Sequence, residues 1–286
     1  MKIGFCTQYK EERIRFAKEA GFDGVEISIS PGSPLDPGVV KDDEVRRAKE
    51  VLDENGIKLL SLFHFFEYGA KDEQKRKEAI ETFPRALEMA KILGTNILTV
   101  NSFTLEEGDL QSRIKYFKEV FTSFAQQAED KGMKIGIENC PHELNNLAYS
   151  PKMWEVVFQE VPSKALGLEY DPSHLVWQQI DYLKAIYDFG DRIYAFHAKD
   201  TEVMKDKLGK SGVLQGLFEG SVWKSDWWRY RLPGYGEVDW KKVFVALADI
   251  GYNGDINIEH EDPVFGGDKT DEGLKRGLKY LKQFIL

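Results

Sequence analysis

The chain has 286 residues, of which 42% are hydrophobic and 30% are charged. This composition is typical of a globular protein that buries a large core, and it excludes an intrinsically disordered chain. The 48 acidic and 39 basic residues give a net charge of −9, which disfavours nucleic acid and anionic membranes as partners.

The start of the sequence and its two cysteines indicate a cytoplasmic protein. Residues 1–6 read directly as a strand, without the basic, apolar and small-residue regions of a signal peptide. No apolar run approaches the roughly 18 residues that a membrane span requires. Cys6 and Cys140 lack the spacing of a zinc site, so we expect both to be buried thiols in a reducing compartment.

Apolar, strand-like runs alternate with charged, amphipathic stretches along the chain. The strands are expected at residues 2–7, 22–30, 57–65, 96–102, 133–139, 164–170, 192–198 and 255–260. The helices are expected at residues 11–20, 42–55, 72–93, 110–131, 151–160, 182–189, 240–250 and 272–284. This alternation is typical of a parallel sheet covered by helices, and eight strands close a barrel. The sequence therefore predicts an α/β protein with a single (β/α)8 TIM barrel domain over residues 1–286; a doubly wound open sheet is the competing fold.

The connection after the seventh predicted strand, residues 201–237, is much longer than the others. Loops of this length are usually functional or disordered, and a high aromatic content argues against disorder. We expect this long loop to be a lid over a site or a contact between subunits of a homo-oligomer. Its aromatic and basic residues are Trp223, Trp227, Trp228, Arg229, Tyr230 and Arg231.

Four predicted strands end in a side chain that can bind a metal ion: Glu138, Asp171, His197 and Glu259. The carboxyl ends of barrel strands all meet at one rim, whereas those of an open sheet spread out, so this coincidence favours the barrel. A single glutamate at a strand end is more often a solvated turn residue. Three carboxylates and one imidazole together indicate a divalent metal site, with Mn²⁺ as the expected ion and Mg²⁺, Co²⁺ or Zn²⁺ as alternatives.

Such a site suits proton transfer next to a carbonyl group. A divalent ion chelated by two neighbouring oxygens of a hydroxyketone acts as a Lewis acid, acidifies the adjacent C–H and stabilises the cis-enediolate. If Glu138 and Glu259 enter from opposite sides of the barrel, one can remove the proton and the other can return it on the opposite face. The sequence therefore predicts an isomerase or epimerase that acts on a ketose or related keto-sugar, with these glutamates as its catalytic residues.

Other polar residues near predicted strand ends are candidates for binding the substrate. His174 either donates to a substrate oxygen or orients the carboxylate that precedes it on the turn. His64 either hydrogen-bonds substrate hydroxyls or packs within the rim. Lys199 and Glu26 are substrate-binding candidates too, although barrel-stabilising salt bridges are the ordinary explanation for them and for Asp200.

Six short segments carry a family resemblance. They are Gly21-Phe-Asp-Gly-Val-Glu26-Ile, Ile137-Glu-Asn-Cys-Pro141, Tyr170-Asp-Pro-Ser-His174, Phe196-His-Ala-Lys-Asp200, Pro233-Gly-Tyr-Gly-Glu-Val-Asp-Trp240 and Ile258-Glu-His-Glu261. Through them the sequence resembles the xylose-isomerase-like (β/α)8 superfamily of sugar isomerases, ketose 3-epimerases, inosose dehydratases and endonuclease IV. The resemblance implies Glu138, Asp171, His197 and Glu259 as Mn²⁺ ligands, the two glutamates as the acid/base pair, and His174 as a substrate-binding histidine.

The sequence departs from two members of that superfamily. Endonuclease IV uses additional histidines for a three-zinc cluster, where this chain has Asn101 and Trp228-Arg-Tyr230, so a trinuclear zinc site is not expected. The ketose 3-epimerases carry a substrate-binding arginine a few residues after the histidine of the seventh strand, where this chain has Val203 and Met204. Arg229 or Arg231 of the long loop could take that role.

Three functional hypotheses follow, and a small sugar is the expected ligand. The first is a metal-dependent sugar isomerase or epimerase. The second is a dehydratase or lyase that acts on a keto-sugar, an inosose or a 3-keto-glycoside, because a leaving group beside the carbanion favours elimination. The third is a catalytically silent sugar-binding protein or an oligomerisation scaffold, since fold alone does not fix function.

Overall fold

Eight parallel strands close into a barrel in the order β1-β10-β7-β6-β5-β4-β3-β2, which confirms the predicted TIM barrel. The computed structural model describes residues 1–105, 107–142 and 144–285. The barrel strands are β1 (Ile3–Thr7), β2 (Gly24–Ile29), β3 (Lys58–His64), β4 (Ile97–Asn101), β5 (Lys134–Glu138), β6 (Leu166–Tyr170), β7 (Ile193–Ala198) and β10 (Ile256–Ile258).

The chain folds as two interleaved units. Unit 1 comprises Met1–Tyr170, Asp191–Phe196 and Asn253–Asn257, and unit 2 comprises Asp171–Gly190, His197–Tyr252 and Ile258–Leu286. Because the chain passes between the units several times, no single linker divides it into consecutive domains. The single domain expected over residues 1–286 stays a prediction.

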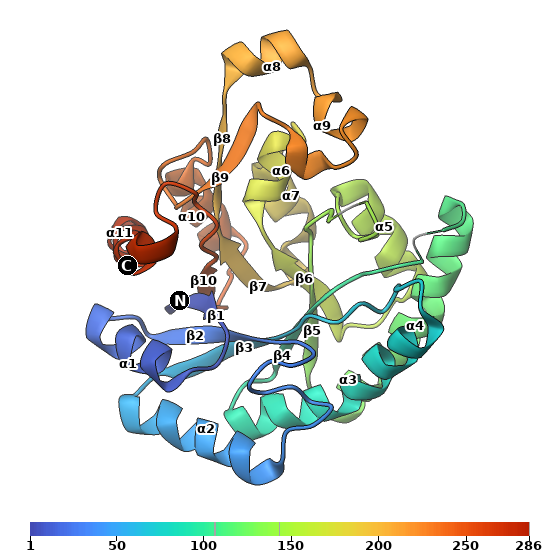
Figure 1. Ribbon diagram of the computed structural model, residues 1–286, viewed down its shortest axis with the longest axis vertical. Helices are drawn as coiled ribbons and strands as arrows, with labels where there is room; N and C mark the ends of the chain where they lie inside the picture. Colours follow the sequence, from blue (N-terminus) through green and yellow to red (C-terminus); the bar gives the residue numbers. More distant parts are fainter. Residues whose placement is uncertain (106, 143, 286) are drawn as a thin grey trace. The chain divides into compact units, whose positions relative to one another are not determined.

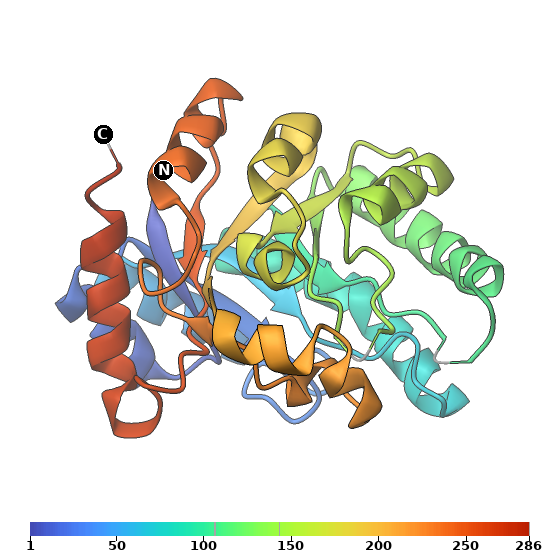
Figure 2. The same cartoon turned by 90° about the horizontal axis from the view of Figure 1, so that it is seen from above.

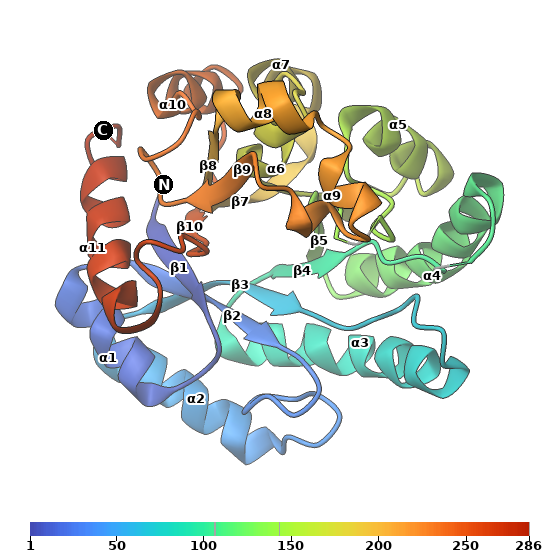
Figure 3. The same ribbon diagram turned by 45° about the horizontal axis from the view of Figure 1, so that its top comes forward.

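Unit 1 contains most of the barrel and five long helices. Figures 1 and 3 show these helices around the outside of strands β1 to β5. They are α1 (Glu11–Ala20), α2 (Asp42–Asn55), α3 (Glu73–Leu93), α4 (Leu110–Asp130) and α5 (Pro151–Glu160). Among the residues that the structure describes, no helix is long and apolar enough to cross a membrane.

Helix α2 shows how the sequence produces these elements. Val45, Ala48 and Leu52 are buried and recur at intervals of three and four residues, so they share one helix face. The helix ends where Gly56 adopts a left-handed conformation with φ of 68°, which glycine adopts without steric cost. The predicted helix over 42–55 is therefore confirmed to the residue.

An aromatic core lies between α3 and α4 in unit 1. Phe83 of α3 stacks on Phe124 of α4, with ring centroids 3.7 Å apart, and both rings are fully buried. Tyr68, from the connection after β3, packs edge-on against Phe124. Burying rings of this size contributes much of the free energy that stabilises a domain.

Unit 2 contains the remaining helices and a two-stranded antiparallel sheet. The helices are α6 (Pro172–Trp177), α7 (Tyr182–Phe189), α8 (Lys205–Ser211), α9 (Gln215–Phe218), α10 (Trp240–Asp249) and α11 (Thr270–Leu281). Strands β8 (Asp200–Val203) and β9 (Trp228–Arg231) pair with each other. Figure 2 shows α8 and α9 in orange as neighbouring short helices between these two strands in the chain.

The long loop 201–237 contains most of the β8–β9 hairpin, with α8 and α9 between its strands, and its role as a lid or subunit contact stays a prediction. Two sequence expectations were wrong at the level of local structure. Residues 172–177 form helix α6 rather than a turn, because Pro172 occupies the first helical position, where its missing N–H costs nothing. Glu26 lies in the middle of β2 rather than at a strand end.

Candidate metal centre

Asp171 begins helix α6 directly after the last residue of β6. Its Oδ1 accepts a hydrogen bond from the backbone N–H of Ser173 at 2.8 Å, which makes it the N-cap of the helix. The side chain is fully buried. One carboxylate oxygen therefore fixes the start of α6, and the other, Oδ2, faces cationic and imidazole groups of unit 2.

Lys199 carries the positive charge of this site. Its ammonium nitrogen lies 2.6 Å from Oε2 of Glu259, 2.8 Å from Oε2 of Glu261 and 3.3 Å from Oδ2 of Asp171. Burial disfavours the charged form of Lys199, but the three carboxylates outweigh burial and hold its pKa well above the usual value. The salt bridges expected for Lys199 are therefore present. Two of these salt bridges join Lys199 to the predicted site residues Asp171 and Glu259.

His174 contacts the same cluster from helix α6. Its Nε2 lies 3.3 Å from Oδ2 of Asp171, and its Nδ1 lies 2.8 Å from the hydroxyl of Tyr230 on β9. The imidazole is almost completely buried. This placement agrees with the expectation that His174 orients Asp171, and a contact with substrate stays a prediction.

His197 and Glu259 form a second histidine–carboxylate pair in unit 2. His197 lies in β7 and is buried, and its Nδ1 is 3.2 Å from Oε2 of Glu259, the residue that follows β10. The structure thus brings together two of the four predicted ligands through a direct contact.

The donor atoms of unit 2 fit a divalent cation. One ligand atom each from Asp171, His174 and Glu259 lies within 4.8 Å of the others. Two carboxylates and an imidazole are donors that Mn²⁺, Mg²⁺ and Zn²⁺ accept. His174 belongs to this group although the sequence analysis did not assign it as a ligand, and His197 contacts the group through Glu259. The ligand role predicted for His197 stays a prediction.

Glu138 is the last residue of β5, as expected, and belongs to unit 1. Its carboxylate is buried, and one of its oxygens lies within 4.8 Å of ligand atoms of Cys140 and His142. The backbone after it is unusual, because His142 and Leu144 have φ of 45° and 67°. Such conformations cost energy in residues other than glycine and often mark functional segments. The catalytic and ligand roles of Glu138 stay predictions.

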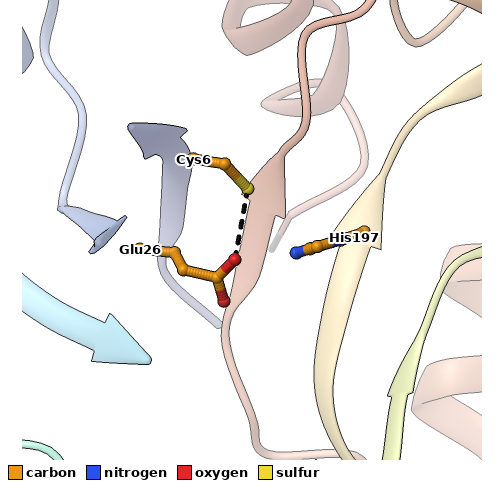
Figure 4. A group of neighbouring side chains, drawn as sticks. All are labelled: Cys6, Glu26 and His197. Atoms are coloured by element: carbon orange, nitrogen blue, oxygen red, sulfur yellow. Dashed lines mark hydrogen bonds between the residues drawn. The ribbon is translucent and has the colours of Figure 1, made fainter. Parts of the chain in front are cut away.

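Glu26 lies in a polar layer inside the barrel of unit 1. Its carboxylate accepts hydrogen bonds from the hydroxyls of Ser61 and Thr99, and from the thiol of Cys6 at 3.5 Å (Figure 4). The amide of Asn257 donates to Ser61 at 3.1 Å and extends the layer to β10. Within unit 1, hydroxyl and thiol groups donate to Glu26, and the salt bridge expected for Glu26 stays a prediction. Cys140 is buried as predicted, but Cys6 is only partly buried.

His64 points from the end of β3 toward helix α3. Its Nδ1 hydrogen-bonds the hydroxyl of Tyr68, and its Nε2 lies 3.0 Å from the hydroxyl of Thr82. The ring also stacks on Phe66, with centroids 4.1 Å apart. Burial lowers the pKa of His64 to about 3. Both ring nitrogens are engaged by protein hydroxyls, which matches the packed-histidine alternative rather than substrate binding.

The two arginines of the long loop are held by acidic side chains. Nε of Arg229 lies 2.7 Å from Oε2 of Glu202, and Nη1 of Arg231 lies 2.5 Å from the same oxygen. Nε of Arg231 also lies 2.8 Å from Oδ2 of the buried Asp262. Arg231 therefore joins β9 to the segment after β10, and Arg229 is the more exposed of the two. A substrate contact for either arginine stays a prediction.

Asp200 holds the segment that contains the Pro-Gly-Tyr-Gly motif. Its carboxylate accepts hydrogen bonds from the backbone N–H groups of Gly234 and Val238, at 3.0 and 2.9 Å, and from the indole N–H of Trp240 at 3.0 Å. Burial raises the pKa of Asp200, and these hydrogen bonds oppose the rise. Asp200 therefore holds the segment 233–240 in place. Within the part of the chain that the structure describes, these neutral donors take the place of the salt bridge expected for Asp200.

Sequence analysis missed two residues of the site, Tyr230 and Glu261. Glu261 had a signal, because it lies two residues after Glu259, and side chains two apart on extended chain point the same way. Tyr230 gave only a weak signal within an aromatic run. Its contact with His174 depends on the β8–β9 hairpin, which was not predicted.

Comparison with known proteins places the chain in a family. The model of the family described as xylose isomerase-like TIM barrel matches residues 14–284. The chain belongs to the xylose isomerase-like TIM barrel family. This membership confirms the superfamily that the six sequence motifs suggested.

Proteins similar to this chain include a curated isomerase and two solved structures. The inosose isomerase of Bacillus licheniformis is 26% identical over 265 residues, which are 92% of this chain and 87% of that protein. D-psicose 3-epimerase of Clostridium cellulolyticum H10, solved with D-tagatose, has a TM-score of 0.76 at 18% identity and covers 99% of both chains. The IOLI protein, solved with a zinc atom, has a TM-score of 0.76 at 20% identity over 100% of this chain and 99% of that one.

The curated relatives include inosose isomerases and inosose dehydratases, which supports the chain as a member of an enzyme family. The donor group around Asp171 is of a kind that accepts a divalent metal ion.

Proposed function

We propose that this protein is a divalent-metal-dependent sugar isomerase or epimerase that transfers a proton next to the carbonyl group of a ketose or related keto-sugar. One observation carries the proposal. In unit 2, Asp171, His174, Lys199 and Glu259 gather into one group, and they come from residues that follow β6, β7 and β10 in the chain; Asp171, His174 and Lys199 are buried. The carboxyl ends of barrel strands are where active sites of this architecture are built.

Four residues would hold the cation: Asp171 and Glu259, with His197 and Glu138 as the further ligands that the family resemblance implies. When bound, a divalent ion there would withdraw charge from a carbonyl oxygen and acidify the neighbouring C–H. Mn²⁺ is the ion we propose, because carboxylate donors dominate the set.

Glu138 and Glu259 are the proposed acid/base pair. We propose that Glu259 exchanges a proton with the substrate carbon and that Glu138 serves the opposite face, so the intermediate is an enediolate. Lys199 supports this chemistry by holding Oε2 of Glu259 in a fixed position through a 2.6 Å contact. General bases of this kind contribute about 10²–10⁴-fold to a rate.

Deuterium uptake tests the proposal. Metal-free protein is reconstituted with Mn²⁺ and incubated in heavy water with a panel of ketoses and inososes, and deuterium next to the carbonyl is followed by NMR. We expect uptake that falls by about 100-fold or more in Glu259→Gln. Glu272→Gln, at an exposed glutamate of α11, is the matched control and should keep wild-type rates.

The three hypotheses give different outcomes in this experiment. Deuterated isomer or epimer supports the proposal. Release of water or an aglycone identifies a dehydratase or lyase that uses the same carboxylates. Sugar binding without exchange or release identifies a silent binding protein and overturns the proposal.

A further inference from the structure

Tyr230 reaches the candidate site from β9, a strand that belongs to the long segment after β7. Its hydroxyl lies 2.8 Å from Nδ1 of His174, and the two rings meet edge to face with centroids 5.4 Å apart. The Lys199 ammonium lies 4.4 Å from the centroid of the same tyrosine ring. Tyr230 therefore contacts both His174 and Lys199 of the candidate site.

The neighbours of His174 decide where its proton resides. A neutral imidazole has one N–H donor and one acceptor nitrogen, and the bond at one nitrogen selects the tautomer. Nε2 lies 3.3 Å from Oδ2 of Asp171, in ionic contact rather than in hydrogen-bond geometry, and the negative charge of this carboxylate favours a proton on Nε2. Nδ1 is then the acceptor, and the hydroxyl of Tyr230 donates to it.

Aromatic packing holds Tyr230 in that position. Trp228, on the same strand, contacts the Tyr230 ring at 5.0 Å and stacks on Trp177 of α6 at 4.7 Å with an interplanar angle of 3°. Strand β9 and helix α6 are thus joined by the indole stack and by the bond between Tyr230 and His174. Rigid rings lose little conformational freedom and are suited to fixing a neighbour.

We propose that Tyr230 is a positioning residue that keeps His174 as an Nε2–H donor. In this state Nε2 cannot coordinate a cation, so of the donor group in unit 2 only Asp171 and Glu259 would hold the ion, and the N–H of His174 faces the carboxylate of Asp171. The inference rests on the proposed function for its catalytic consequence, but the tautomer itself does not depend on activity. The inference also gives the two histidines different roles, because His197 is then the imidazole that would bind the cation.

Nitrogen NMR of the full-length protein labelled with ¹⁵N-histidine tests the tautomer. His174 is identified by the signal that disappears in His174→Gln, and spectra are recorded with and without diamagnetic Mg²⁺. We expect wild-type His174 to be protonated on Nε2 in both conditions. Tyr230→Phe keeps the ring and its packing but removes the donor, so its Nδ1 signal should shift or report mixed tautomers. Tyr235→Phe, at an exposed tyrosine of the same unit, should match the wild type.

Two NMR results would overturn the inference. One is a wild-type His174 protonated on Nδ1, and the other is a Tyr230→Phe spectrum identical to that of the wild type. Melting curves of both phenylalanine variants show whether the fold is retained, and the exchange of tyrosine for phenylalanine is expected to retain it.

Kinetics give a second readout on whichever ketose of the panel takes up deuterium. We expect Tyr230→Phe to lower kcat about tenfold, the effect of one lost hydrogen bond in the transition state, with KM changed less than about threefold. An unchanged kcat would contradict a positioning role. If no ketose exchanges deuterium, the proposed function fails, and the NMR result alone decides the role of Tyr230.

Discussion

Nζ of Lys199 lies 2.6 Å from Oε2 of Glu259, within a site where three carboxylates surround one buried ammonium group. The lysine neutralises charge that a divalent cation would also neutralise. A divalent cation held by Asp171 and Glu259 would share these carboxylates with Lys199, and this relationship has consequences for stability.

Replacing Lys199 by methionine should destabilise the protein and increase its response to metal. Removal of one partner from a buried ion cluster costs about 3 kcal/mol, because Asp171 is left buried without that charge. Mn²⁺ should restore more stability to Lys199→Met than it adds to the wild type. Urea denaturation with and without Mn²⁺ measures both effects. An equal gain in the two proteins would show that the ion binds elsewhere.

The arginines of β9 should differ in their importance for stability. Arg231→Gln leaves the buried Asp262 without its guanidinium partner, and we expect a loss of about 2–4 kcal/mol in the free energy of unfolding. Arg229→Gln removes a more exposed contact to Glu202 and should cost less than about 1 kcal/mol. Urea denaturation of both variants makes the comparison, and similar losses would refute it.

His64 should make the stability of the protein fall as the pH is lowered. Its pKa is about 3 in the folded chain and 6.5 as a model value, so between these values the unfolded chain binds a proton that the folded chain does not. Stability therefore rises with pH across this window, and His64 accounts for a loss of about 2.5 kcal/mol between pH 6 and pH 4.

The variant His64→Gln keeps polar atoms at this position but has no titrating group. Its free energy of unfolding should change by about 2.5 kcal/mol less than that of the wild type over the same pH range. Parallel pH profiles of the two proteins would show that His64 becomes protonated within the folded chain.

The barrel was predictable because strands and helices alternate with strong hydrophobic patterns. Helices α2, α5 and α7 begin and end at the predicted residues. Several predicted strands were too long, since flanking residues such as Phe22, Ile57 and Met133 are buried without belonging to a strand. Hydrophobicity reports burial, and it does not separate a strand from the buried residues next to it.

The β8–β9 hairpin was not predictable from the same patterns. Its strands have four residues each, and β9 reads Trp-Arg-Tyr-Arg, in which charged residues replace the apolar run expected of a strand. The register pairs Asp200 with Arg231 and Glu202 with Arg229, and Glu202 binds both arginines, so contacts between residues about thirty apart organise this sheet. Such long-range pairs leave no local signal.

The acidic residues Asp171 and Glu259 were predictable, and so were His174 and Lys199 as their neighbours, but Tyr230 and Glu261 were not. Glu259 and Asp171 stand out because a carboxylate follows an apolar strand. The role of Tyr230 depends on a contact with a histidine 56 positions earlier. The carboxylate of Glu26 could be found as a polar residue within a strand, but only the register with Cys6 and Ser61 shows which donors surround it.

The divalent cation site is open to direct titration. Metal-free protein is titrated with Mn²⁺, and the EPR signal of the free ion reports binding. We expect one ion per chain, a Kd at least about tenfold higher in Asp171→Asn, and an unchanged Kd in Asp181→Asn, where the exposed N-cap of α7 is altered in the same way. Absence of a bound ion, or equal affinity in the two variants, would contradict a metal centre built on Asp171.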